Sequence, residues 1–154
     1  MKENPVIHQV GEIGPYVSHL FTISEDEVTF SEAILIKYGH QCDYPFYHLI
    51  SLKTEIQRRV QGLATKNLLE INNFLMNEGI VGILENGILS TNPCYTMYEK
   101  NGWKKSNKYT NWMMYNKPDA INNDDIDKMI EYLITEECDD SLESIEVRLS
   151  SYGE

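Results

Sequence analysis

The first half of the chain alternates short apolar runs with polar turns, a pattern typical of β-strands. Residues 17–23, 28–36 and 46–54 form such runs. The first two are separated by the acidic turn Ser24-Glu25-Asp26-Glu27, and the third follows a turn near Pro45. Together these runs predict an antiparallel meander.

The spacing of apolar positions changes after residue 54. An amphipathic helix is predicted from about Gly62 to Asn77, because the apolar residues there recur at steps of three and four. These residues are Leu63, Leu68, Ile71, Phe74 and Leu75. Gly79 stands where a left-handed cap residue is expected, and the apolar run Ile80–Leu84 is suited to a buried strand. Strand, helix and strand therefore form a crossover.

The remaining third of the chain predicts shorter elements. Thr91-Asn92-Pro93 supplies an N-cap and a first-turn proline for a short helix that ends at Asn101-Gly102. Residues 112–115 and 145–149 indicate strands. Residues 126–134 fit a helix and a strand equally well, because their apolar positions satisfy both periods.

The composition is that of one soluble domain spanning residues 1–154. At 42% hydrophobic residues the chain can bury a real core, and no apolar run approaches the roughly 18 residues of a membrane helix. The N-terminus lacks a secretory signal, so we expect a cytoplasmic protein. Cys42, Cys94 and Cys138 are an odd number without close pairs, which argues against a disulfide framework and against a zinc site. No metal is expected.

The acidic residues are concentrated at the C-terminal end. The formal net charge is −11, and residues 119–154 hold 12 of the 24 acidic residues but only Lys128 and Arg148 of the basic ones. Such a segment repels nucleic-acid phosphates and attracts cationic ligands, although it can equally be a solubilising, solvated tail. We therefore expect no nucleic-acid partner and no membrane partner.

A glycine-containing segment precedes the predicted helix. Arg59-Val60-Gln61-Gly62-Leu63-Ala64-Thr65 follows an apolar strand and leads into the helix N-terminus. The first N–H groups of a helix have no partner within the helix, so this arrangement binds phosphate oxygens. An ordinary helix start after a loop is the alternative interpretation.

Two motifs in this order resemble the GNAT superfamily of N-acetyltransferases. The family's pyrophosphate loop, Arg/Gln-x-x-Gly-x-Gly/Ala, is matched by residues 59–64. Its later pattern, Ala-x-x-x-Tyr-x-x-x-Gly-Phe/Trp, is matched from Cys94 through Tyr98 to Gly102-Trp103. The resemblance covers about residues 17–115. The sequence before and at the end of the second motif is most similar to aminoglycoside 2'-N-acetyltransferases.

The resemblance implies an α/β (α+β) fold. Its central sheet is mixed and mostly antiparallel, flanked by helices, with a V-shaped splay between two parallel strands, here residues 46–54 and 80–84. Acetyl-CoA would be the co-substrate, bound in the splay. The residues implied in binding it are Ser51, Leu52, Thr54, Arg59, Val60, Gln61, Gly62, Leu63, Ala64 and Thr65.

The resemblance also assigns catalytic candidates. Tyr98 takes the family position whose phenol lies near the thioester sulfur, so it would be the general acid; the alternative is a core aromatic residue. A general base is not evident from the motifs. His48 and Glu55 are the candidates by position, at the start and end of the cofactor strand, although a histidine on an apolar strand is more often structural.

The implied reaction is acetyl transfer from acetyl-CoA to a primary amine of a small cationic acceptor. Aminoglycosides, polyamines and a basic peptide N-terminus all fit the acidic segment. The chain departs from the family before residue 17, where only a remnant strand at Val6–Val10 fits and two helices have no room. The acceptor cleft is then either open or covered by the acidic tail or a partner chain. The remaining alternative is that the protein is a truncated, inactive relative of the family. A homodimer is one possibility, and a non-catalytic module that binds acyl-CoA or a basic protein is the alternative function.

Overall fold

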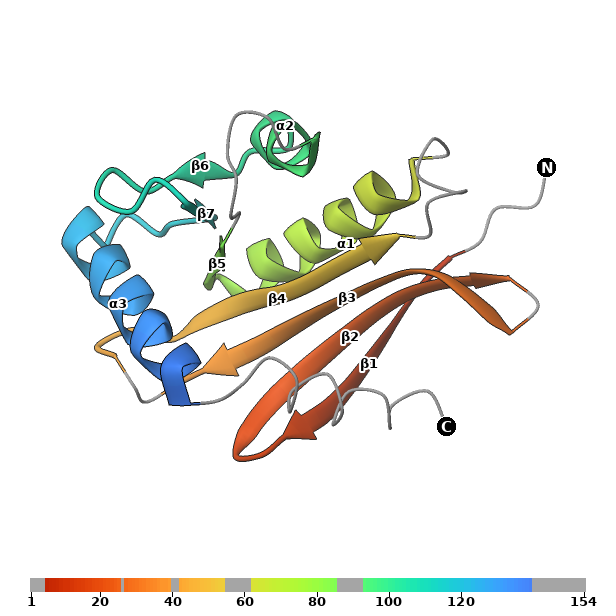
Figure 1. The fold of residues 1–154 in the computed structure, drawn as a ribbon, viewed down its shortest axis with the longest axis horizontal. Helices are drawn as coiled ribbons and strands as arrows, with labels where there is room; N and C mark the ends of the chain where they lie inside the picture. The colour runs from red at the N-terminus through yellow and green to blue at the C-terminus, as the bar shows by residue number, and fades with distance from the viewer. Residues whose placement is uncertain (1–4, 26, 40–41, 55–61, 86–92, 140–154) are drawn as a thin grey trace.

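The computed structural model describes residues 5–25, 27–39, 42–54, 62–85 and 93–139, which form one mixed sheet with helices on both faces (Figure 1). Its seven strands follow the order β1-β2-β3-β4-β5-β7-β6. The strands are β1 (Val6–Ile13), β2 (Tyr16–Glu25), β3 (Val28–Tyr38), β4 (Phe46–Thr54), β5 (Val81–Glu85), β6 (Lys104–Lys105) and β7 (Trp112–Tyr115). The helices are α1 (Leu63–Glu78), α2 (Pro93–Lys100) and α3 (Asn123–Asp139).

The strand pairing confirms the predicted meander and crossover. β1 to β4 pair in sequence order and are all antiparallel, whereas β4 and β5 are parallel and are connected through α1. The predicted helix at residues 62–77 and the predicted strands at 80–84 and 112–115 agree with α1, β5 and β7 to within one residue. The predicted strand at residues 145–149 lies outside the described residues.

The N-terminal strand runs directly into the meander. β1 extends from Val6 to Ile13, three residues beyond the predicted remnant, and pairs with β2 along its whole length. Only Gly14 and Pro15 connect the two strands, and Gly14 adopts a positive φ of 57°. This tight hairpin confirms that no helix is inserted between the first two strands.

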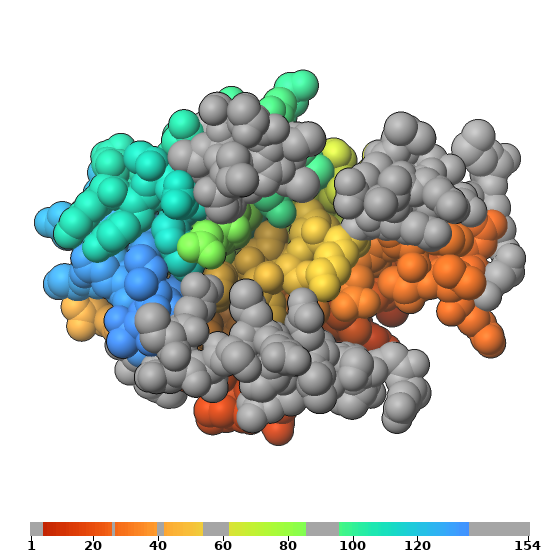
Figure 2. Space-filling view, viewed as in Figure 1, coloured from red at the N-terminus to blue at the C-terminus, as the bar shows by residue number. Residues whose placement is uncertain are grey.

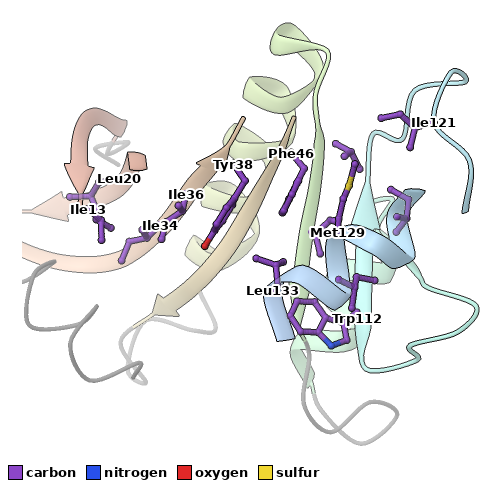
Figure 3. Close-up of a cluster of buried hydrophobic side chains, with 14 residues drawn as sticks. Ile13, Leu20, Ile34, Ile36, Tyr38, Phe46, Trp112, Ile121, Met129 and Leu133 are labelled. Atoms are coloured by element: carbon purple, nitrogen blue, oxygen red, sulfur yellow. The ribbon is translucent and has the colours of Figure 1, made fainter. Parts of the chain in front are cut away.

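The C-terminal helix α3 covers the face of the sheet opposite α1 and α2. The ambiguous segment 126–134 is helical, because α3 buries Ile126, Met129, Ile130 and Leu133 at steps of three and four. These residues pack against apolar side chains from β2, β3, β4, β5 and β7 (Figure 3). Part of the acidic segment thus forms a helical layer on this face of the sheet.

A capping box fixes the start of α3. The Asn122 side-chain oxygen accepts a hydrogen bond from the Asp125 backbone N–H at 2.9 Å, and the Asp125 carboxylate accepts one from the Asn122 N–H at 3.0 Å. The two side chains therefore satisfy two N–H groups reciprocally. Asp124 and Asp125 also place negative charge at the positive end of the helix dipole, which stabilises the first turn.

The other helical layer is formed by α1 and α2. Leu68, Ile71 and Leu75 of α1 are fully buried against the sheet, and the same core cluster includes Tyr98 of α2 and the nearby Trp103. None of the described helices is long and apolar enough to cross a membrane.

Replacing a buried residue of α3 is expected to destabilise the protein. Ile130 has no exposed side-chain surface, so Ile130→Ala should lower the free energy of unfolding by about 2–5 kcal/mol. Ile134, one turn later, is 38% exposed, and Ile134→Ala should change stability by about 0.5 kcal/mol or less. Urea unfolding followed by circular dichroism measures both. Equal effects of the two variants would contradict the packing of α3 on the sheet.

Candidate functional site

The parallel strands β4 and β5 pair over only three residues and then diverge. The pairs are Phe46↔Val81, Tyr47↔Gly82 and His48↔Ile83. Beyond His48, β4 continues to Thr54 paired with β3, whereas β5 continues to Glu85 paired with β7. In the described part of the chain, residues 49–54 therefore have no strand partner on the β5 side. We call this divergence the splay; it is the feature that the sequence resemblance implies.

A β-bulge in β4 accounts for the splay. The register with β3 passes from Ile34↔Ser51 to Leu35↔Leu49, so Ile50 is an extra residue in β4. A bulge bends its strand and increases the local twist. Because Ile50 lies two residues after the last pair with β5, the bend directs β4 away from β5 where the splay opens. A single sequence does not show this bulge, since no residue near Ile50 marks the change of register with β3.

The N-terminus of α1 lies beside the open end of β4 (Figure 1). Gly62 precedes the helix with φ 72° and ψ 19°, and its carbonyl oxygen accepts a hydrogen bond from the Lys66 N–H at 2.9 Å. A residue with a Cβ pays about 1–2 kcal/mol for this left-handed conformation. Gly62 has no side chain that could cap the helix, and the first turn of α1 contains no acidic residue. The predicted helix N-terminus is therefore present, and anion binding at it stays a prediction.

The other predicted cofactor residues fall into two groups. Ser51 and Leu52 are half-buried on β4 beyond the bulge, Thr54 ends that strand, and Leu63, Ala64 and Thr65 form the half-buried first turn of α1. β4 reaches the molecular surface near the middle of the face shown in Figure 2. Glu55, Arg59, Val60 and Gln61 lie outside the described residues.

The second motif positions Tyr98 within the core between α1 and α2. Tyr98 is 8% exposed, and its ring centroid lies 6.0 Å from that of Trp103. The Trp103 N–H donates to the Tyr98 carbonyl oxygen at 3.0 Å, and Trp103 Nε1 donates to Asn72 Oδ1 at 2.9 Å. Part of this motif thus fastens the end of α2 to α1. The catalytic role of Tyr98 stays a prediction.

His48 lies at the apex of the splay, on the face covered by α3. It is 5% exposed, and its ring centroid is 5.8 Å from that of Trp112. Burial lowers the pKa of His48 to about 3, so the imidazole is neutral and a much weaker base than a solvated histidine. His48 and Tyr98 therefore lie on opposite faces of the sheet, and the lowered pKa disfavours His48 as the general base.

His19 is a second buried histidine, and it lies on the opposite face of the sheet from His48. Nδ1 of His19, on β2, is 2.8 Å from Nε2 of His8, on β1. Burial, together with the neighbouring His8, lowers the pKa of His19 to about 4. The part of the chain that the structure describes contains no group of three or more His, Cys, Asp or Glu residues placed to hold a metal ion.

Comparison with known proteins identifies the fold. No family model and no curated protein matches the chain. Among solved structures, the ribosomal-protein-S18-alanine N-acetyltransferase from Escherichia coli is similar at 13% identity and TM-score 0.50, over 72% of this chain and 77% of that chain. A chain of the NatC complex bound to Gag peptide and CoA matches at 14% identity and TM-score 0.51, over 66% and 71%. A chain of the KacTA–DNA complex matches at 17% identity and TM-score 0.51, over 82% and 76%.

At these identities the likeness shows the fold alone. The chain has a GNAT-like fold, in agreement with the predicted mixed sheet, parallel strand pair and flanking helices. The narrower resemblance to aminoglycoside-modifying members is not supported by these structures and stays a prediction.

The buried histidines predict a loss of stability in mild acid. His19 and His48 bind protons in the unfolded chain near the ordinary histidine pKa of about 6.5, but in the folded protein only at much lower pH. Lowering the pH below about 6.5 therefore favours unfolding, with a slope that approaches about 1.4 kcal/mol per pH unit for each histidine. Urea unfolding between pH 7 and pH 5 measures this slope, and His48→Gln should make it shallower. An unchanged slope in the variant would contradict the buried, neutral state of His48.

Proposed function

We propose that this chain is an N-acetyltransferase that moves an acetyl group from acetyl-CoA to a primary amine of a small cationic acceptor. The observation that carries the proposal is the splay of β4 and β5, which opens beside the N-terminus of α1, where Gly62 provides no side-chain cap. Among the described residues, the edge of β4 beyond His48 has no strand partner and the N-cap Gly62 has no capping side chain. The strand edge and the helix start can therefore offer hydrogen-bond donors and acceptors to a ligand that is part amide chain and part phosphate.

Two sets of backbone groups hold the co-substrate in this proposal. The N–H groups of the first turn of α1, from Leu63 to Thr65, donate hydrogen bonds to the pyrophosphate oxygens. Gly62 leaves space beside them, because a Cβ at Gly62 would meet none of the described residues, its chain neighbours aside, within 4 Å. The edge of β4 between Ser51 and Thr54 pairs with the amide groups of the pantetheine arm. Arg59, from the same motif, would pair with phosphate.

The bound co-substrate supplies an acetyl group activated as a thioester. A backbone N–H at the splay stabilises the negative charge that develops on the carbonyl oxygen as the amine nitrogen bonds to the carbonyl carbon. The Tyr98 phenol donates its proton to the sulfur as the carbon–sulfur bond breaks, and it regains a proton from solvent. We assign removal of the amine proton to Glu55 in preference to His48, because burial has lowered the pKa of His48 to about 3.

The acidic segment supports a cationic acceptor. Asp124, Asp125 and Asp127 lie in the first half of α3, so part of the negative charge belongs to the folded molecule and not only to a tail. This field raises the local concentration of cations and repels nucleic-acid phosphates. Aminoglycosides and polyamines both fit, and acetyl-CoA use agrees with the cytoplasmic location that the sequence predicts.

Binding of acetyl-CoA tests the co-substrate site. In calorimetric titrations Gly62→Asp should weaken acetyl-CoA binding at least tenfold, because its carboxylate repels the pyrophosphate, whereas Gly62→Asn should stay within a few-fold of wild type. The pair is matched, since Asn and Asp both tolerate positive φ and both cap helices. If the folded wild-type protein binds no acetyl-CoA, the alternative of a non-catalytic module that binds a basic protein is favoured. Unchanged binding by Gly62→Asp would place the pyrophosphate elsewhere.

The role of Tyr98 is tested by removing only its hydroxyl group. Tyr98→Phe keeps the ring in the core and should lower kcat about 10²–10⁴-fold without changing the Kd of acetyl-CoA, since general-acid catalysis contributes by that factor. Release of free CoA thiol, measured with aminoglycosides and polyamines as acceptors, reports the rate. A variant with wild-type kcat would show that Tyr98 is a core aromatic residue and not the acid.

A further inference from the structure

The two edges of the sheet differ sharply in how they are protected. At one edge β6 is two residues long, and both of them, Lys104 and Lys105, are exposed. Short edge strands and lysine side chains are devices that prevent edge-to-edge pairing. At the other edge β1 is eight residues long and pairs with β2 without any register shift. No strand of the described chain pairs with the outer side of β1.

The sequence of β1 contains none of these devices. Val6–Ile13 has no proline, lysine or arginine, and its only carboxylate is Glu12. Ile7 is 47% exposed and Val10 is 64% exposed, on opposite faces of the strand. A long, regular edge strand that exposes apolar side chains either aggregates or is an interface. The contrast with the lysine edge of the same sheet favours an interface.

We propose that β1 pairs with β1 of a second copy of this chain, antiparallel about a two-fold axis, so that one sheet runs through both copies. Self-pairing is isologous: the same strand supplies both sides of the interface, and the assembly closes at two copies. In this dimer the short β6 strand of each copy, with its two lysines, forms an outer edge of the shared sheet. This dimer is independent of the proposed catalytic activity, because β1 lies three strands away from β4.

The side chains of β1 select a register for this pairing. Alternate residues share a face: His8 contacts Phe74 of α1, whereas Ile13 belongs to the cluster under α3. A register centred on Val10 keeps these faces aligned and sets the two exposed Val10 side chains opposite each other. It also sets Ile7 of each copy opposite Ile13 of the other, and Glu12 opposite His8. No two like charges meet, whereas a register centred on Glu12 would oppose two carboxylates.

The mass in solution tests the proposal. Light scattering or sedimentation of the full chain at micromolar concentration should give about twice 17.9 kDa. Val10→Lys puts a charge on the edge and should give the monomer. The matched control is Val28→Lys: Val28 is 52% exposed, but it lies on β3, inside the sheet. A monomeric wild type, or a Val10→Lys protein that remains dimeric, would overturn the proposal.

Cross-linking tests the register and does not depend on how the lysine variant folds. Side chains directly opposite in an antiparallel pair have Cβ atoms about 4.5–5.5 Å apart, close enough for a strained or slightly adjusted disulfide. Val10→Cys should therefore form a covalent dimer on mild oxidation. Gln9→Cys should not, because residue 9 faces Gly11 of the other copy. The wild type, with its three cysteines, gives the background. Absence of cross-linking at residue 10, or equal cross-linking at residues 9 and 10, would rule out this register.

Discussion

The three parallel pairs between β4 and β5 are the joint on which the rest of the structure depends. Among the described strands they form the only ladder that links the meander β1–β4 to the C-terminal strands β5, β6 and β7. α1 packs directly on this joint, because a Cβ at Gly82 would lie 2.6 Å from Leu75 Cδ1. The proposed function requires this ladder to be short, because a longer ladder would close the splay. The bulge at Ile50 ends the ladder at His48.

Amide side chains fix α1 to the C-terminal half of the sheet. Asn72 accepts from Trp103 Nε1 and donates to the Asn101 carbonyl oxygen, while Asn116 Nδ2 donates to the carbonyl oxygens of Leu75 and Ile80. On the other side, Asn67 donates to the Phe21 carbonyl oxygen and to Ser31 Oγ, which belong to β2 and β3. The helix whose N-terminus faces the open end of β4 is therefore held from both halves of the sheet, and its position does not depend on apolar packing alone.

Local patterns in the sequence predicted most of the helices and strands. The features that they did not predict depend on contacts between residues far apart in the sequence. The period of α1 and the glycines at its two ends, Gly62 and Gly79, bounded that helix to within one residue, because caps and periodicity are local properties. The segment around Met129 satisfied both periods, and only its packing on the sheet and the capping box at Asn122 select a helix. The bulge at Ile50 and the short β6 depend on register, which one sequence does not display. For the candidate site, the motifs singled out Gly62 and Tyr98, whose roles stay predictions. They gave no sign that His48 is buried, because the face on which it lies is covered by α3, a helix that the motifs do not include.

The direct hairpin between β1 and β2 has a consequence for the order in which the molecule assembles. With only two residues between these strands, the meander from β1 to β4 is built from contacts between neighbours in sequence, which cost little loop-closure entropy. The parallel ladder joins residues that are more than 30 positions apart, and α3 adds to a sheet that already exists. Contacts of low sequence separation form fastest. A nascent chain would thus have its meander early, whereas the splay and the joint that holds it are completed only after β5 and β7 have been synthesised.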